Sequence, residues 1–188
     1  MAIPGSLLSA AHVVHLKSER LVMRRFTVED DELLVELDSD PEVVKHVGGV
    51  PSTLARIREE VIPRVVGYYD TLVDGGVWAT HEIATGAFIG WFHYRPDRAP
   101  PHDQELGYRL RRAAWGKGYA TEMSRVILTH AFEALRHPRV IAHAEKANTK
   151  SWHVMEKLGM TRELERQESG VPVVQYGISR EAWSRRSA

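Results

Sequence analysis

The sequence predicts an α/β protein of the α+β kind, a mixed sheet with helices on its faces. Two observations lead to this class. Strand-like runs are grouped in the first half of the chain, and helical periodicities alternate with strands in the second half. Clusters of Gly, Pro, Asp and Asn separate the runs. At 188 residues, one domain with a sizeable core is favoured over two.

The first half predicts strands, two helical stretches and a hairpin. Residues 20–26 alternate like a half-buried strand, and Thr27 is placed to cap a helix with acidic residues in its first turn. A second helical stretch carries Pro63, which must break or kink it. The predicted elements are a strand at 20–26, helices at 27–40 and 54–72, turns at 74–76 and 84–86, and hairpin strands at 77–84 and 87–96.

The second half alternates between strands and helices. One face of its long helix carries Met123, Val126, Ile127, His130 and Ala131, and Gly159 ends the later helix. The predicted elements are a loop at 99–103, strands at 104–110, 139–145 and 171–180, and helices at 119–135 and 151–160.

Composition excludes several classes of function. Lys and Arg together number 25, as do Asp and Glu, so no net charge steers the chain toward nucleic acid or an anionic membrane. No apolar run approaches the roughly 20 residues of a membrane helix. The absence of cysteine excludes a thiolate nucleophile and fits a cytoplasmic protein. Residues 1–15 are expected to form a flexible or loosely docked N-terminal extension before a single domain at 16–188.

No metal site is expected. The 10 histidines are scattered, and His12 and His15, although at helical spacing, have no obvious third ligand. A homodimer is compatible with the sequence, but nothing in it indicates an interface.

The segment Trp-Gly-Lys-Gly at 115–118 follows a strand and opens a helix. Glycines there allow positive φ and close approach of a ligand, and the N–H groups of a first helical turn favour an anion. The segment matches neither the Walker loop nor G-x-G-x-x-G. For these glycines alone, a plain strand-to-helix turn is the alternative.

Three motifs together, ELGYRL, RRAAWGKGYATE and AEKANTKSWHVMEKLGM, resemble the GNAT superfamily of acetyl-CoA-dependent N-acetyltransferases, and most closely the ribosomal-protein N-terminal branch. The resemblance covers roughly residues 16–180. It implies a mixed, mostly antiparallel sheet of six or seven strands that splays open around the pantetheine arm of acetyl-CoA, with helices on both faces. It places the pyrophosphate on the loop at 116–120, with Trp115 fixing that loop. The implied acetyl-CoA-binding residues are Leu110, Arg111, Arg112, Gly116, Lys117, Gly118, Tyr119, Ala120, Thr121 and Asn148.

Two positions depart from the superfamily pattern. Ala113 stands where many members carry Gln or Arg, and Arg111 and Arg112 are candidates for the missing cationic help. Met155 stands where many members carry a tyrosine that acts as general acid. Met155 cannot donate a proton, so the tyrosine mechanism does not transfer.

Direct transfer requires a neutral amine, a polarised thioester carbonyl and a thiolate that can leave. Glu105, at the start of the strand before the loop, is the first candidate base, directly or through a water, and a solvated strand charge is the alternative. His143 and His81 are weaker candidates. Under the resemblance Ser151 lies near the thioester sulfur and Asn148 binds the pantetheine arm. The alternative is that Asn148 caps a helix and Ser151 lies in its first turn.

The sequence therefore predicts an N-acetyltransferase that uses acetyl-CoA. The expected acceptor is a primary amine, either a protein N-terminus or a small molecule. A non-catalytic acyl-CoA-binding module and a nucleotide-phosphate binder remain as alternatives. The acceptor pocket is expected from the first helices and the loops at 38–52 and 97–103, which do not identify the amine.

Overall fold

The computed structural model describes residues 13–73 and 75–187. Two compact units make up the chain. One holds the chain up to His93 together with Tyr108–Tyr119, and the other holds Tyr94–Gly107 and the chain from Ala120 onward. The strands form an open, mostly antiparallel eight-stranded sheet in the order β1-β2-β3-β4-β5-β6-β8-β7. The predicted fold class is confirmed, and the sheet has one or two strands more than expected.

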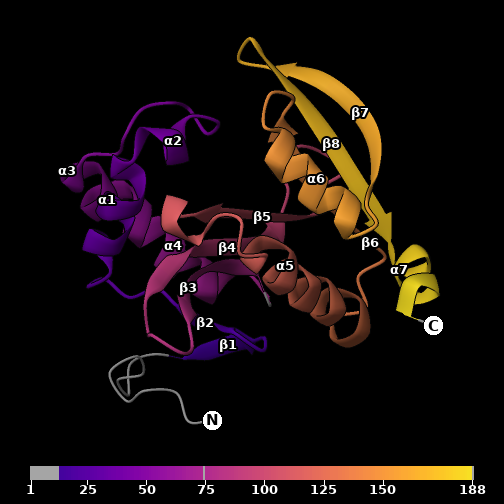
Figure 1. Cartoon of the computed structure of the whole chain (residues 1–188), viewed down its shortest axis with the longest axis horizontal. Helices are drawn as coiled ribbons and strands as arrows, with labels where there is room; N and C mark the ends of the chain where they lie inside the picture. The colour runs from indigo at the N-terminus through magenta and orange to yellow at the C-terminus, as the bar shows by residue number, and fades with distance from the viewer. Residues whose placement is uncertain (1–12, 74, 188) are drawn as a thin grey trace. The chain divides into compact units, whose positions relative to one another are not determined.

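The first unit holds the N-terminal strands and the first helices (Figure 1). Its elements are β1 (Val14–Lys17), β2 (Leu21–Arg25), α1 (Asp31–Ser39), α2 (Pro41–Val44), α3 (Leu54–Arg56), the π-helical turn η1 (Ile57–Val61), α4 (Ile62–Thr71), β3 (Gly76–Glu82) and the first part of β4 (Phe88–Pro96). β2 pairs antiparallel with both β1 and β3. The predicted hairpin is β3–β4, closed by a hydrogen bond from the Glu82 nitrogen to the Ala87 carbonyl at 2.9 Å.

Two details of β2 and α1 differ from the prediction. β2 lies between β1 and β3 and is buried at four successive positions, Leu21 to Arg24, rather than alternately, so side chains on both of its faces are covered. The buried Arg24 is accommodated by Asp30, which holds its guanidinium in two bonds of 2.7 and 2.8 Å. Asp30, not Thr27, occupies the N-cap position of α1, and Thr27 belongs to the turn before it.

The second helical stretch changes its hydrogen-bonding register before Pro63, as the proline requires. Ile62 donates its N–H to the carbonyl of Ile57, one residue further back than in an α-helix, and Pro63 then lies in the first turn of α4. Proline is tolerated there because a first-turn nitrogen has no intrahelical partner.

Residues 1–12 of the expected extension and Asp74 of the expected turn lie outside the described residues. Val14 and His15, which were also assigned to the extension, belong to β1. The His15 ring stacks on Trp78 of β3, with 4.1 Å between ring centres.

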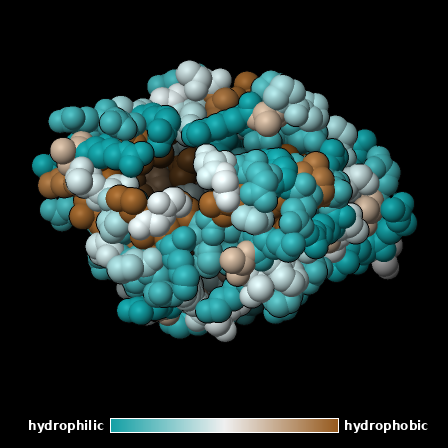
Figure 2. All heavy atoms as spheres, turned by 90° about the horizontal axis from the view of Figure 1, so that it is seen from above, coloured by the Kyte–Doolittle hydropathy of each residue, from teal (hydrophilic) through white to brown (hydrophobic). Residues whose placement is uncertain are grey.

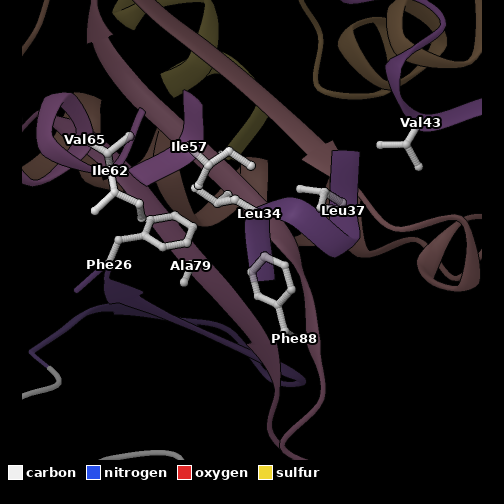
Figure 3. Packing of buried hydrophobic residues seen from close by; sticks show 9 residues of the cluster. All are labelled: Phe26, Leu34, Leu37, Val43, Ile57, Ile62, Val65, Ala79 and Phe88. Carbon is white, nitrogen blue, oxygen red and sulfur yellow. The ribbon is translucent and has the colours of Figure 1, made fainter. Parts of the chain in front are cut away.

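The core of the first unit packs α1, η1 and α4 against β3 and β4. Figure 3 shows its side chains, with Phe26, Ile62 and Val65 in one group. The buried members are Phe26, Leu34, Leu37, Val43, Ile57, Ile62, Val65, Ala79 and Phe88. The Tyr69 hydroxyl adds a polar tie beside this core by accepting a hydrogen bond from the Phe26 nitrogen at 2.9 Å and donating to the Val77 carbonyl.

The second unit holds the remaining strands with three helices (Figure 1). Its elements are the last part of β4, the first part of β5 (Gln104–Leu110), α5 (Tyr119–Thr129) continued by the π-helical turn η3 (His130–Ala134), β6 (Arg139–Glu145), α6 (Thr149–Lys157), β7 (Thr161–Glu168), β8 (Val171–Ser179) and α7 (Arg180–Ser187). β6 and β7 pair antiparallel with β8, and β5 pairs parallel with β6 at Gln104 and Glu105.

β7 and α7 are elements that the sequence did not predict. β7 reads TRELERQE, and nearly all of its side chains are exposed, so no apolar alternation announces it. It is an edge strand whose charges form ion pairs with neighbours, including Lys146 with Glu165 at 2.9 Å. Charged side chains on an edge strand also oppose pairing with other chains.

The predicted apolar face of α5 and η3 is confirmed in part. Met123, Ile127 and Ala131 are buried, whereas Val126 and His130 are half-buried. Phe132 of η3 packs on Trp183 of α7, with 5.9 Å between ring centres.

Hydrophilic residues dominate the face of the molecule in Figure 2. Within the described residues, no helix is long and apolar enough to cross a membrane.

Candidate active site

The glycine-rich loop belongs to the first unit and follows β5 through a 3₁₀ turn at Arg112–Ala114. Gly116 and Gly118 adopt φ of 74° and 80°, in the left-handed region that favours glycine. A Cβ on Gly116 would meet no described heavy atom within 4 Å, and one on Gly118 would meet only Arg20 Nη2 at 3.6 Å. The main chain at both glycines is therefore open to a group that approaches it.

Trp115 fixes the start of this loop, as expected. Its ring packs against the core of the first unit, and its Nε1 donates to the carbonyl of Leu110 at 2.8 Å. The Leu110 side chain is buried, and its main-chain carbonyl holds Trp115.

Two cations flank the loop. Arg20, from the turn between β1 and β2, donates from Nη2 to the Lys117 carbonyl at 3.1 Å and lies 4.6 Å from the centre of the Tyr119 ring. Lys117 Nζ lies 5.9 Å from the same ring. The Tyr119 hydroxyl in turn donates to Glu82 of β3. No sequence pattern predicts this role of Arg20, because 97 positions separate it from Lys117 along the chain.

The two arginines proposed as cationic help both form ion pairs with carboxylates. Arg111 forms an ion pair with Glu36 of α1 and donates to the Phe88 carbonyl at 3.1 Å. Arg112 lies 3.1 Å from a carboxylate oxygen of Asp40. Arg20 is a further guanidinium at this loop, with its Nη2 3.6 Å from the Cβ position of Gly118.

The other predicted residues belong to the second unit. Ala120 and Thr121 lie in the first turn of α5. Asn148 caps α6, its Oδ1 accepting a hydrogen bond from the Ser151 nitrogen at 3.3 Å, so the capping reading of Asn148 is confirmed. Ser151 lies half-buried in the first turn. Met155 is buried in the same helix and offers no proton.

Glu105 is not a solvated strand charge. Its carboxylate lies 2.9 Å from Arg95 Nη2 and 3.6 Å from His143 Nδ1, and only 13% of the Glu105 and His143 side chains is exposed. Burial alone would lower the pKa of His143, but hydrogen bonds to Glu105 and Gln175 outweigh it and raise that pKa above the usual 6.5. The structure thus joins the first candidate base to one of the two weaker candidates.

His81, the other weak candidate, is a core histidine. Its Nδ1 lies 3.1 Å from the Gly86 carbonyl, and its ring meets Phe88 edge to face. No cluster of three or more potential ligands is arranged for a metal ion in the described part of the chain.

Comparison with known proteins identifies the class. Residues 20–161 match the model of the acetyltransferase (GNAT) domain. The chain is 31% identical, over 90% of its length and 78% of the relative's, to an FsC-acetyl coenzyme A-N(2)-transacetylase of Aspergillus fumigatus. It is 29% identical, over 79% of its length and 83% of the relative's, to an uncharacterized N-acetyltransferase, p20, of Bacillus licheniformis.

The solved structures agree. A GNAT-family acetyltransferase from Bacillus anthracis superposes with a TM-score of 0.76 at 26% identity, over 90% of this chain and 99% of the other. A ribosomal-protein-S5-alanine acetyltransferase from Vibrio fischeri has a TM-score of 0.72 over 91% and 98% of the two chains, but at 17% identity it shows the fold alone. The chain belongs to the GNAT family and is an N-acetyltransferase.

Proposed function

We propose that this enzyme binds the pyrophosphate of acetyl-CoA on the loop at 115–120 and transfers the acetyl group directly to a primary amine. The single observation that carries this proposal is the pair of left-handed glycines with open space above their main chain. The first N–H groups of α5 follow directly, and they are suited to an anion because they lack intrahelical acceptors. Arg20 and Lys117 add positive charge beside them.

The pantetheine arm is assigned to Asn148 and Ser151 in this proposal. The Oδ1 atom of Asn148 is used by the helix cap. Its amide nitrogen, a donor, supplies the hydrogen bond that a pantetheine carbonyl would accept. Ser151, one turn into α6, has a hydroxyl that can stabilise or protonate the departing thiolate.

Direct transfer needs a group that removes a proton from the amine, because an ammonium has no lone pair for attack on the thioester. Glu105 is the proposed base, directly or through a water. Its small exposed fraction supports this role, since a partly buried carboxylate interacts more strongly with an incoming charge than one in bulk water. The chain has no cysteine, which agrees with transfer in one step without a thiol intermediate.

The acceptor is a small-molecule amine or a protein N-terminus. The Aspergillus relative is named as an N(2)-transacetylase, which supports an amine acceptor here. An α-amino group titrates near 7.7–8.0 and a lysine side chain near 10.4, so an α-amine needs less help from a base. The ribosomal-protein branch suspected from the motifs falls within this acceptor class.

A screen for CoA release tests the proposal. The protein is incubated with acetyl-CoA and a panel of small amines, amino-acid derivatives and N-terminal peptides, each beside its N-blocked counterpart. We expect CoA release with at least one free amine, none with its blocked form, and an acetylated product by mass spectrometry. CoA release that is equal for free and blocked forms, without acetylated product, would mean hydrolysis and refute the proposal.

A further inference from the structure

The cluster around His143 lies within the second unit and contains the proposed base, Glu105. Its members come from four strands, with Arg95 on β4, Glu105 on β5, His143 on β6, and Gln175 on β8. Glu105 pairs with Ile141 in the parallel register, and His143 follows Ile141 by two residues, so all three side chains lie on one face. This face brings the imidazole to the carboxylate.

Gln175 determines which protons the imidazole carries. Its side-chain oxygen lies 2.9 Å from His143 Nε2 and accepts from Arg166 Nη1 at 2.9 Å, while its nitrogen donates to Glu163 at 3.0 Å. Both ends of the amide are therefore oriented by charged partners. Since the oxygen faces Nε2, the tautomer that suits this contact carries its proton on Nε2.

The other ring nitrogen, Nδ1, then holds the proton that can be exchanged. Nδ1 faces the Glu105 carboxylate, an arrangement that favours a proton between them. The remaining charges at this ring are Arg166, whose Nη2 lies 3.4 Å from Nε2 and opposes protonation, and Arg95 and Glu163, one contact away. These opposing groups leave a net rise of the His143 pKa.

We propose that Glu105 and His143 act as a relay, in which Glu105 accepts the amine proton and His143 holds it on Nδ1. This inference rests on the function proposed above and assigns His143 as a positioning residue that acts through Glu105. In the step, the ammonium gives one proton to the carboxylate, which passes it to Nδ1. The amine lone pair then forms the C–N bond, the C–S bond breaks, and its electron pair leaves on the CoA thiolate. The second amine proton goes to the thiolate or to water.

The relay resolves a difficulty with Glu105 alone. Arg95 already neutralises Glu105 from 2.9 Å, whereas a base is most effective when its pKa lies near the working pH. A neutral His143 beside Glu105 provides such an acceptor. Because the pair accepts a proton only when His143 is neutral, turnover should fall as the pH falls through the raised His143 pKa.

The test measures pH–rate profiles of wild type, His143→Gln and, as a matched control, His153→Gln on the exposed side of α6. For His143→Gln we expect turnover at neutral pH to fall by about tenfold to a hundredfold, near the lower end for acid–base catalysis. We also expect its acid limb to move to lower pH, with the Michaelis constant for acetyl-CoA unchanged. His153→Gln should match wild type. An unchanged profile in an active His143→Gln variant overturns the relay and leaves acetyl transfer intact.

A second measurement does not depend on turnover. The His143 ring is titrated by NMR in wild type and in Glu105→Gln. We expect a pKa above 6.5 in wild type and a lower one in Glu105→Gln. Equal pKa values in the two proteins would overturn the coupling. A wild-type protein that acetylates no amine would instead refute the proposed function, whatever the titration shows.

Discussion

Gly90 of β4 lies against the main chain of Arg109 in β5. A Cβ on Gly90 would stand 2.1 Å from the Arg109 carbonyl oxygen and 2.8 Å from the Leu110 Cα. The φ of Gly90 is 132°, which also strains any residue with a side chain. The main chains of β4 and β5 therefore approach closely at the end of β5, just before the glycine-rich loop.

Gly90→Ala should therefore destabilise the protein strongly. Backbone atoms cannot move aside as a flexible side chain can, so we expect a loss of at least about 1–3 kcal/mol, as for overpacked cores. Gly67→Ala is the matched control, because Gly67 lies inside α4 with no neighbour within 4 Å of its Cβ position. It should gain about 0.5–1 kcal/mol. Urea unfolding measures both, and equal stabilities of the two variants would contradict the close approach.

Stability should fall in acid through Asp30. Burial raises the pKa of this carboxyl, but the hydrogen bonds from Arg24 and Thr27 outweigh it, and the net pKa lies below 3.8. A carboxyl with a depressed pKa stabilises the fold fully above its unfolded pKa, and this contribution is lost as the pH falls through the folded value. Asp30→Asn should flatten this acid dependence. At neutral pH it should cost about 3–5 kcal/mol, because it leaves Arg24 buried without a counter-charge. Thermal melts from pH 7 to pH 2 would measure both effects. An equal dependence of stability on pH in wild type and Asp30→Asn would contradict the role of Asp30.

Gly118→Leu should weaken acetyl-CoA binding. The new side chain would enter the space assigned to the pyrophosphate, and we expect a rise in Kd of about tenfold or more, or 1.4 kcal/mol. Gly170→Leu is the control for backbone strain, because Gly170 has a nearly equal φ of 82°, against 80° for Gly118, and open surroundings in the β7–β8 turn. Isothermal titration calorimetry on both folded variants measures the affinity. Equal affinity in Gly118→Leu and wild type would remove the loop from the acetyl-CoA site.

Substitutions of Asn148 and of Ser151 should affect different steady-state constants. Asn148→Ala removes the helix cap as well as the amide donor, so Asn148→Ser, which keeps a capping oxygen, is the sharper variant. We expect both variants to raise the Michaelis constant for acetyl-CoA, and only Asn148→Ala to lower stability, by about 1 kcal/mol. An unchanged acetyl-CoA dependence would leave Asn148 with the cap alone.

Ser151→Ala should lower turnover by less than about a hundredfold with little change in affinity, since a CoA thiolate needs little help to leave. Loss of all turnover with intact binding would instead make Ser151 an essential acid.

The sequence by itself determined the family and most of the elements. Six strands, the long helices and the turn between β3 and β4 follow from local periodicity and turn residues, which act over a few positions. The strand-to-helix position of Gly116 and Gly118 also appears in the sequence, and both glycines adopt the positive φ that only glycine takes readily. These features were predictable because neighbouring residues decide them.

Only the tertiary structure decided which charges meet. Arg20 lies 97 positions from Lys117 along the chain, and Glu105 lies 38 positions from His143. Arg111 and Glu36 are likewise far apart. Such pairs leave no periodic signal in the sequence. β7 was missed for a related reason, because an exposed edge strand needs no apolar face and owes its conformation to the hydrogen bonds of β8. Local sequence favours a conformation, but the partners of a charge are set by the strands that folding brings alongside it.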